Sequence, residues 1–380
     1  MRRRTAYILI LSMVSLLAIG IVMLFSTGAF ARDSHGDMYY FVKRQGMWLV
    51  IGAVALVGAS LMDYRWWARL WPWVYGLAIV LLALCFVPPI GMNINGAWRW
   101  INLGFASFQP SELGKIAILM FLASWYHRHE AEAGNFWQGF AQPLAVCSVI
   151  LGLIVIEVDL GTTALIGVTA LSVMFVAGTG MRWLVPLLSI GLAGLVFAIF
   201  NIEERMGRLL AFIDPAKHRL GEGLQQWQAL LAFGAGGVDG LGLGNGRQKM
   251  LYLPYAHTDF IFPMIGEELG LRFTLLTVFC FLLILLAGAL IAMNSKDRFG
   301  MLLGFGITII ISLQAAINIG VTTSMLPNKG MPLPFISYGG SNLAVSMFLI
   351  GILLNIHRQG RREPTPRVRA VPSTSIAVRF

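Results

Sequence analysis

Polar residues are rare in this chain, and those that could do chemistry fall in five short segments. The most suggestive segment is 253–262, where His257, Thr258 and Asp259 stand among apolar neighbours. A carboxyl group in apolar surroundings tends to have a raised pKa, which suits a general base. The segment lacks further His or Cys at ligand spacing, which argues against a zinc site. Asp259 is therefore a candidate general base. The alternative is a cluster of hydrogen-bonded polar groups that only stabilises the fold.

A second segment combines Arg99 with an acid and a base that share a helix. Pro110 followed by a serine suits a helix start, and Glu112 would lie in the first turn, where the helix dipole favours a carboxylate. Lys115 follows three residues later and therefore lies on the same helix face as Glu112. Arg99, Glu112 and Lys115 are candidates for binding substrate. The alternative is a capped helix with a local ion pair.

A third segment, 327–341, is rich in proline and glycine, and this composition favours non-helical backbone near the outer membrane surface. Lys329 is a candidate there to bind an anion. The alternative is an interfacial lysine that extends to the lipid headgroups. Ser337 in the same segment, together with His257, completes the set of candidate substrate-binding residues.

The two remaining segments have a stronger structural explanation. Asp159 stands at a tight break between two apolar runs, where it is predicted to cap the following helix. Segment 234–246 is rich in glycine but matches neither a P-loop nor a dinucleotide-binding fingerprint. Its glycines are predicted to allow close packing or irregular backbone beside a cavity.

The composition places all of these segments in a membrane protein. Of the 380 residues, 57% are hydrophobic and 12% are charged, and the mean hydropathy is +0.74. Soluble globular proteins have about 45–50% apolar and about 25% charged residues, so a cytosolic enzyme, a disordered chain and a nucleic-acid-binding domain are excluded. The net charge of +10 comes in large part from basic residues that flank apolar runs, where it is an orientation signal.

The apolar runs predict an all-α polytopic membrane protein. Spanning about 30 Å of hydrocarbon takes roughly 20 apolar residues as helix, and the pattern lacks the alternation of a transmembrane β-barrel. The predicted domain is a single transmembrane unit over 1–357, with a long extracytoplasmic loop at 201–270 and a basic, disordered tail at 358–380. About ten candidate spans begin near Ala6, Gly46, Leu70, Leu113, Ala141, Leu160, Trp183, Leu271, Met301 and Leu343.

The distribution of basic residues predicts which side of the membrane each loop faces. Lys and Arg gather at the N-terminus, after the second and eighth spans, and in the tail, and loops rich in them stay in the cytoplasm. Both termini are therefore predicted to be cytoplasmic. The loops that hold Arg99, Asp259 and Lys329 are predicted to lie outside.

Taken together, these segments resemble the SEDS family of shape, elongation, division and sporulation proteins (FtsW, RodA and SpoVE), from about Ala6 to His357. Segment 327–330 is more similar to the division branch than to the elongation branch. Two positions depart from the family pattern, since Tyr255 stands where many relatives have Glu and Asn342 where Ser is usual. The most specific motifs are Gly244-Asn245, Leu253-Pro254, 257–262, 267–270 and 334–341.

The resemblance implies ten transmembrane helices and a peptidoglycan glycosyltransferase of the bacterial plasma (inner) membrane, which polymerises lipid II during cell division or wall growth. Within it, Asp259 matches the family's essential carboxylate, and Arg99, Glu112, Lys115 and Lys329 match other functional positions. The resemblance also implies a class B penicillin-binding transpeptidase as partner, because this chain has no domain to crosslink peptides, and contacts with other division or elongation proteins.

The implied reaction sets chemical requirements. A sugar hydroxyl attacks an anomeric carbon and expels a lipid pyrophosphate, so a base is needed, and fixed cations or a divalent cation such as Mg²⁺ or Mn²⁺ must stabilise the departing charge. The alternative function is a flippase or transporter for lipid II. That alternative needs polar groups through both leaflets, whereas several of the predicted spans carry almost no charge at mid-membrane depth.

Overall fold

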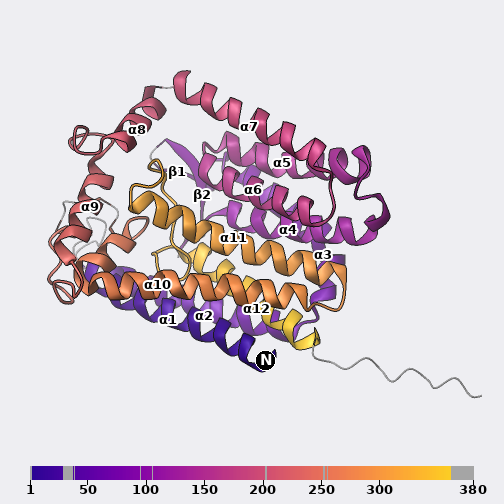
Figure 1. The fold of residues 1–380 in the computed structure, drawn as a ribbon, viewed down its shortest axis with the longest axis horizontal. Coiled ribbons are helices and arrows are strands. Elements are labelled where there is room, and N and C mark those ends of the chain that lie inside the picture. The colour runs from indigo at the N-terminus through magenta and orange to yellow at the C-terminus, as the bar shows by residue number, and fades with distance from the viewer. Residues whose placement is uncertain are drawn as a thin grey trace, which may run out of the picture.

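The computed structural model describes residues 2–28, 37, 39–94, 96–104, 106–201, 203–250, 253–254 and 256–360. A helix occurs at each of the ten predicted spans, and most of these helices lie side by side in one bundle (Figure 1). Their bounds are α1 Arg2–Gly28, α2 Tyr40–Leu61, α3 Trp67–Leu84, α4 Pro110–Arg128, α5 Gln142–Ile156, α6 Leu160–Val176, α7 Met181–Asn201, α10 Ile261–Met293, α11 Arg298–Thr322 and α12 Gly340–Gly360.

The all-α membrane fold predicted from the sequence is confirmed. Within the described ranges, seven helical segments are long and apolar enough to cross a membrane, and α6 and the Met181–Gly194 part of α7 are shorter apolar helices. In α4, the charged pair Glu112 and Lys115 lowers the apolar content of a helix of 19 residues. The number of crossings therefore stays a prediction.

The core lies where α4, α11 and α12 contact their neighbours. In α4, Ile118 and Phe121 are fully buried, and α4 contacts α3, α6 and α11. The other strong helix pairs are α2 with α12, α10 with α11, and α1 with α10. At the periphery, Trp73 of α3 and Phe197 of α7 are exposed and apolar. Such surfaces suit contact with lipid, because lipid tails are as apolar as these side chains.

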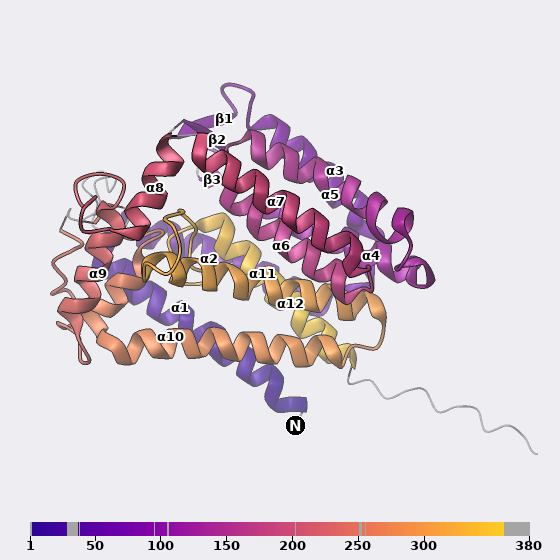
Figure 2. The same ribbon diagram turned by 45° about the horizontal axis from the view of Figure 1, so that its top comes forward.

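The long connection between α7 and α10 lies at one end of the bundle. This end holds α8 (Glu203–Ile213) and α9 (Leu224–Gly236), whereas the first residues of α1 and the end of α12 lie at the opposite end (Figures 1 and 2). A small antiparallel sheet with the order β1-β2-β3 follows α3. Its strands are β1 (Gly91–Ile94), β2 (Ala97–Asn102) and β3 (Ser107–Phe108). We did not predict this sheet, because its strands are too short to show a clear period of two.

The range 201–270 is not a plain loop. It holds α8, α9 and the first turns of α10, which begins ten residues before the predicted start at Leu271. At Gly270 the backbone is non-helical, with φ 76° and ψ −173°, so the predicted span is the part of α10 beyond this kink. At the other end of the chain, α12 continues to Gly360, past the predicted start of the tail, and 361–380 lie outside the described residues.

Candidate active site

Asp259 lies directly before α10, and two distant segments hold it. Its backbone carbonyl accepts a hydrogen bond of 2.8 Å from Asn318 Nδ2 of α11. The same amide donates to Met331 O at 2.6 Å, so Asn318 ties the Asp259 segment to the proline-rich segment 327–336. Gly330 of that segment lies against the Asp259 carboxyl group, because a β-carbon at position 330 would be 2.5 Å from Oδ2.

The surroundings of Asp259 suit a general base. The pKa of this carboxyl group is raised from 3.8 to about 6, because burial and, to a lesser extent, the negative charge of Asp159 raise it more than the positive charge of Arg99 lowers it. A carboxyl group with such a pKa is ionised at neutral pH and is a stronger base than an ordinary aspartate. The sequence predicted this direction from the apolar neighbours of Asp259.

Asp159 and Arg99 lie near Asp259, and their charges act on it. Arg99 and residues 157–161 together are called the wall of the site below. As predicted, Asp159 caps α6: its carboxylate accepts from Thr162 N at 3.2 Å and from Thr162 Oγ1 at 2.8 Å. Arg99 of β2 donates to Val158 O at 2.6 Å, on a turn where Val158 has a positive φ of 64°. Arg99 therefore holds the turn between α5 and α6 while its charge acts on Asp259.

Glu157, on the same turn, is a buried acid to which we assigned no role. Its side chain is 1% exposed, and its carboxyl group faces the buried thiol of Cys85. Burial, with a smaller contribution from the charge of Asp159, raises the pKa of Glu157 to about 8. Glu157 is therefore mostly uncharged at neutral pH, which explains how it tolerates its position.

Lys329 reaches the same wall from the proline-rich segment. A β-carbon at Gly161, in the first turn of α6, would lie 2.9 Å from Lys329 Cε. The lysine stem therefore packs over the helix start that Asp159 caps. The structure thus brings together the candidate base, Asp259, and two of the predicted cations, Arg99 and Lys329.

Two other candidates support the backbone near the site. Ser337 is 4% exposed, and its hydroxyl accepts a hydrogen bond of 2.8 Å from Leu333 N, which closes its own turn. His257 stacks near Phe41, with ring centroids 4.3 Å apart, and its carbonyl accepts from Tyr338 N at 3.0 Å. Their predicted contact with substrate stays a prediction.

Lys115 and Glu112 form the local ion pair that was the alternative for their segment. Lys115 Nζ lies 2.7 Å from Glu112 Oε1, and both side chains are 4% exposed. Lys115 also donates to Gln314 Oε1 at 2.9 Å, and Asn342 Nδ2 donates to Glu112 at 3.2 Å. Gln314 in turn donates to Pro332 O, which connects this buried pair to the segment around Lys329. A role of this pair in substrate binding stays a prediction.

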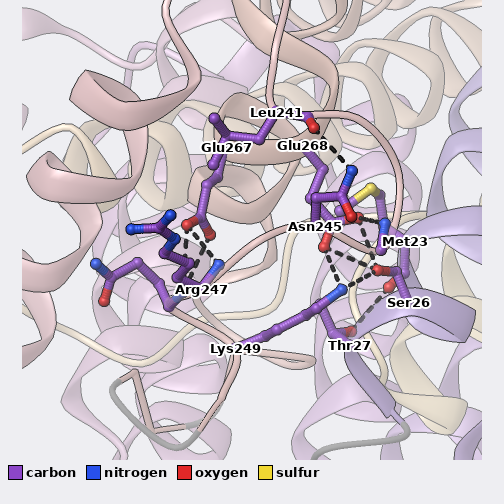
Figure 3. A network of polar contacts seen from close by, with 11 residues as sticks. Met23, Ser26, Thr27, Leu241, Asn245, Arg247, Lys249, Glu267 and Glu268 are labelled. Carbon is purple, nitrogen blue, oxygen red and sulfur yellow. Dashed lines mark hydrogen bonds and ion pairs between the residues drawn. The ribbon is translucent and has the colours of Figure 1, made fainter.

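Glu267 and Glu268 lie in the first turns of α10, before the kink at Gly270, and both are buried. Figure 3 shows their carboxylates facing the loop that follows α9. Glu267 accepts from Arg247 N at 2.7 Å and from Gln248 N at 3.2 Å, and Glu268 accepts from Gly244 N at 2.9 Å. Both carboxylates therefore bind the backbone of this loop.

A buried lysine completes this network. Lys249 Nζ pairs with Glu268 Oε1 at 2.5 Å and donates to Ser26 Oγ of α1 at 2.7 Å. The Lys249 and Glu268 side chains are 1% and 0% exposed. This pair anchors the segment that leads to Asp259, and the sequence offered no signal for it beyond a lysine shortly after the glycine-rich stretch.

The glycines of 234–246 allow this anchoring, as predicted. A β-carbon at Gly246 would lie 2.7 Å from Glu268 Oε1, and one at Gly236 would overlap the carbonyl of Gly266. Gly240 has φ +80°, and its β-carbon would overlap the carbonyl of Glu268. Close packing of this loop against α10 therefore requires glycine at these positions.

A complete metal site is absent from the described ranges, where no three His, Cys, Asp or Glu side chains come together as ligands. Asp259 and Asp159 are the acids that act on each other beside Arg99. Two carboxylates can hold Mg²⁺ when substrate phosphates supply further oxygens. These residues fit a divalent cation only in company with a phosphorylated substrate.

Comparison with known proteins reveals similarity over nearly the full length. The model of the FtsW, RodA and SpoVE family of cell cycle proteins matches residues 7–362. A probable peptidoglycan glycosyltransferase FtsW from Geobacter metallireducens is 39% identical over 358 residues, which are 94% of this chain and 96% of the relative. Stage V sporulation protein E from Bacillus subtilis is 36% identical over 355 residues, 93% of this chain and 97% of that protein.

Solved structures share the fold. A chain from a study of polymerization and crosslinking by a peptidoglycan synthase complex aligns with a TM-score of 0.78 and 26% identity, over 93% of this chain and 98% of that chain. The rod shape determining protein RodA of Thermus thermophilus aligns with a TM-score of 0.67 and 26% identity, over 93% of this chain and 97% of that chain.

Proposed function

Since this chain belongs to the FtsW, RodA and SpoVE family of cell cycle proteins, we propose that it is a peptidoglycan glycosyltransferase that polymerises lipid II. It is a multi-pass protein of the bacterial inner membrane. Its product is the glycan strand made during cell division or wall growth.

The reaction joins two sugars. The oxygen of an acceptor hydroxyl forms a bond to the anomeric carbon of the donor, and the bond from that carbon to the lipid pyrophosphate breaks. The electron pair of the broken bond leaves with the pyrophosphate, and the hydroxyl proton goes to a base. A hydroxyl is a poor nucleophile at neutral pH, so the base must lie within hydrogen-bond reach of it.

The placement of Asp259 carries this proposal. Its carboxyl group has a pKa of about 6, lies beside the side-chain-free Gly330 and is ionised at neutral pH. In the reaction Asp259 accepts the proton of the attacking hydroxyl. Proton transfer of this kind contributes typically about 10²–10⁴-fold to a rate.

Arg99 and Lys329 serve the other half of the reaction. Arg99 holds the 157–158 turn, and the stem of Lys329 packs against Gly161, so both cations lie against the wall that includes Asp159. Fixed cations stabilise a pyrophosphate as it gains negative charge. Asp159 and Asp259 would hold a divalent cation, Mg²⁺ or Mn²⁺, which would supply further positive charge to the departing pyrophosphate.

The protein works with a transpeptidase. The study of the complex that holds the similar chain concerns the structural coordination of polymerization and crosslinking by a peptidoglycan synthase complex. The partner we propose is a class B penicillin-binding protein, with other division or elongation proteins around the pair. The similarity to FtsW proteins favours division.

The site faces outward, with both termini in the cytoplasm. Cysteines placed singly at Glu222 and Ser295 test this orientation with a thiol reagent that cannot cross membranes. The first variant is expected to react from outside, and the second only after the membrane is opened. Reaction of Ser295→Cys from outside would contradict the orientation.

The decisive experiment is purified protein with lipid II, with and without the transpeptidase, scored for glycan polymer by gel electrophoresis. Asp259→Asn keeps the shape of the side chain and removes its basicity. Asp239→Asn is the matched control, because Asp239 is exposed and pairs with Arg272 at the surface. Polymer from the parent and the control, and none from Asp259→Asn, supports the proposal. Transport of lipid II across liposomes without polymer would favour a flippase instead.

A further inference from the structure

Two amide side chains of α11, Gln314 and Asn318, face the proline-rich segment 327–336. They lie four residues apart and therefore on the same face of the helix. Both are buried. A buried amide costs free energy unless its polar atoms find hydrogen-bond partners, so this pair in an apolar helix must gain bonds that offset the cost.

The proline-rich segment needs donors from outside its own backbone. It holds three prolines, at positions 327, 332 and 334, and its residues form neither helix nor strand. A buried carbonyl without a partner costs free energy. The carbonyl of the buried Met331 accepts from Asn318 Nδ2 at 2.6 Å. The next carbonyl, Pro332 O, accepts from Gln314 Nε2 at 2.8 Å, so α11 holds two consecutive carbonyls by side-chain amides.

Asn318 uses the same nitrogen to hold the residue of the base. Its Nδ2 also donates to Asp259 O at 2.8 Å. Both partners are carbonyl oxygens, which only the nitrogen end of the amide can face, and that nitrogen carries two N–H donors. Lys329 directly precedes Gly330 and Met331 in the segment held by the same amide. One side chain therefore connects the residue of the base to the segment that carries a cation of the site.

Gln314 connects this segment to the buried ion pair of α4. Its Oε1 accepts from Lys115 Nζ at 2.9 Å, which leaves its nitrogen end to face Pro332 O. Glu112 holds Lys115 in turn at 2.7 Å. The ion pair thereby fixes which way the Gln314 amide points.

We propose that Asn318 and Gln314 are positioning residues, which keep the carboxylate of Asp259 and the ammonium group of Lys329 in a fixed arrangement. This inference rests on the proposed function. The base acts on the attacking hydroxyl and the cation on the departing pyrophosphate, so both must match the geometry of one transition state. A misplacement of about 1 Å can cost about 10²-fold in rate.

Asn318→Leu tests this role, because it removes both hydrogen bonds at nearly the same side-chain volume. Rates are measured with lipid II and the transpeptidase. We expect kcat to fall about 10²-fold and KM to stay at the parent value, since the lost interaction serves the transition state. The rate should still fall toward acid pH, because Asp259 remains in place to titrate. Gln314→Leu, which removes one tie to the segment, should lower kcat by a smaller factor.

Asn355→Leu is the matched control. Asn355 of α12 is also buried, donates to Ser60 O at 2.8 Å and accepts from Tyr64 N at 2.9 Å. It lies near the end of α12, at the opposite end of the bundle from α8 and α9 (Figure 1). Both leucine variants lose buried hydrogen bonds and should lower the melting temperature, but only Asn318→Leu should lower kcat.

The outcomes separate a positioning role from a structural one. Equal losses of kcat in Asn318→Leu and Asn355→Leu would overturn the inference, and so would a parent-like kcat in Asn318→Leu. If Asn318→Leu does not fold, the comparison is made between Asn318→Gln and Asn355→Gln. Glutamine keeps both N–H groups on a side chain one methylene longer, so Asn318→Gln should lower kcat less than leucine but more than Asn355→Gln does, and equal values would refute the positioning role.

The proposed function is tested separately by the parent protein. Absence of polymer from the parent and its partner would overturn the proposed function itself. Polymer from the parent, with unchanged kcat in the Asn318 and Gln314 variants, would overturn the positioning role alone.

Discussion

The pH dependence of polymerisation is the most direct test of Asp259 as the base. Only the ionised carboxylate accepts a proton, so activity is expected above the pKa of about 6 and is lost as the pH falls through it. At pH 8 nearly all of the carboxyl group is ionised, whereas at pH 5 only about a tenth is. The rate with lipid II should therefore fall about tenfold between these values.

Two variants test whether the acid limb of the pH profile comes from Asp259. Asp259→Asn should lower the rate by about 10²–10⁴-fold and remove the acid limb of the profile, because no base of that pKa remains. Asp159→Asn removes a neighbouring negative charge that raises the pKa of Asp259, so it should move the acid limb to lower pH. Asparagine still caps a helix, so the start of α6 is preserved in this variant.

The assay is the initial rate of polymer formation from pH 5 to 8, with the transpeptidase present at each point. Lipid II binding by each variant, measured separately, shows whether a loss of rate comes from chemistry or from affinity. The reasoning is refuted if Asp259→Asn retains the acid limb of the parent. It is refuted equally if Asp159→Asn leaves the limb in place or moves it to higher pH.

Two further predictions concern buried ion pairs. Lys249→Met removes the cation that pairs with the buried Glu268 carboxylate and should destabilise the protein by about 3–5 kcal/mol, because breaking a buried pair leaves an uncompensated charge. The double variant with Glu268→Gln should recover most of the lost stability in detergent melting. Additive losses from the two substitutions would contradict the coupling. Lys115→Met likewise strands Glu112 and should lower the melting temperature, whereas Lys329→Met should keep it and reduce polymerisation. Equal melting losses in the two lysine variants would show that Lys329 also has a structural role.

The sequence by itself determined the membrane fold and the identity of the candidate base. Hydropathy and length are local properties, so the helices appear at all ten predicted spans. The apolar neighbours of Asp259 predicted the direction of its pKa shift, and the break at Asp159 predicted a helix cap, because burial tendency and capping are both readable from adjacent residues. The glycine-rich stretch likewise predicted close packing.

Only the tertiary structure decided which of these residues meet. Ser26 and Glu268 are 242 positions apart and share a hydrogen bond, and Asn318 reaches back 59 positions to hold the carbonyl of Asp259. The same packing placed Lys115 in a buried pair and set the carboxylate of Glu267 against the backbone of the loop that follows α9. A single sequence reports local hydropathy and turn chemistry, whereas contacts between distant segments depend on how whole helices fit together, which no local pattern encodes.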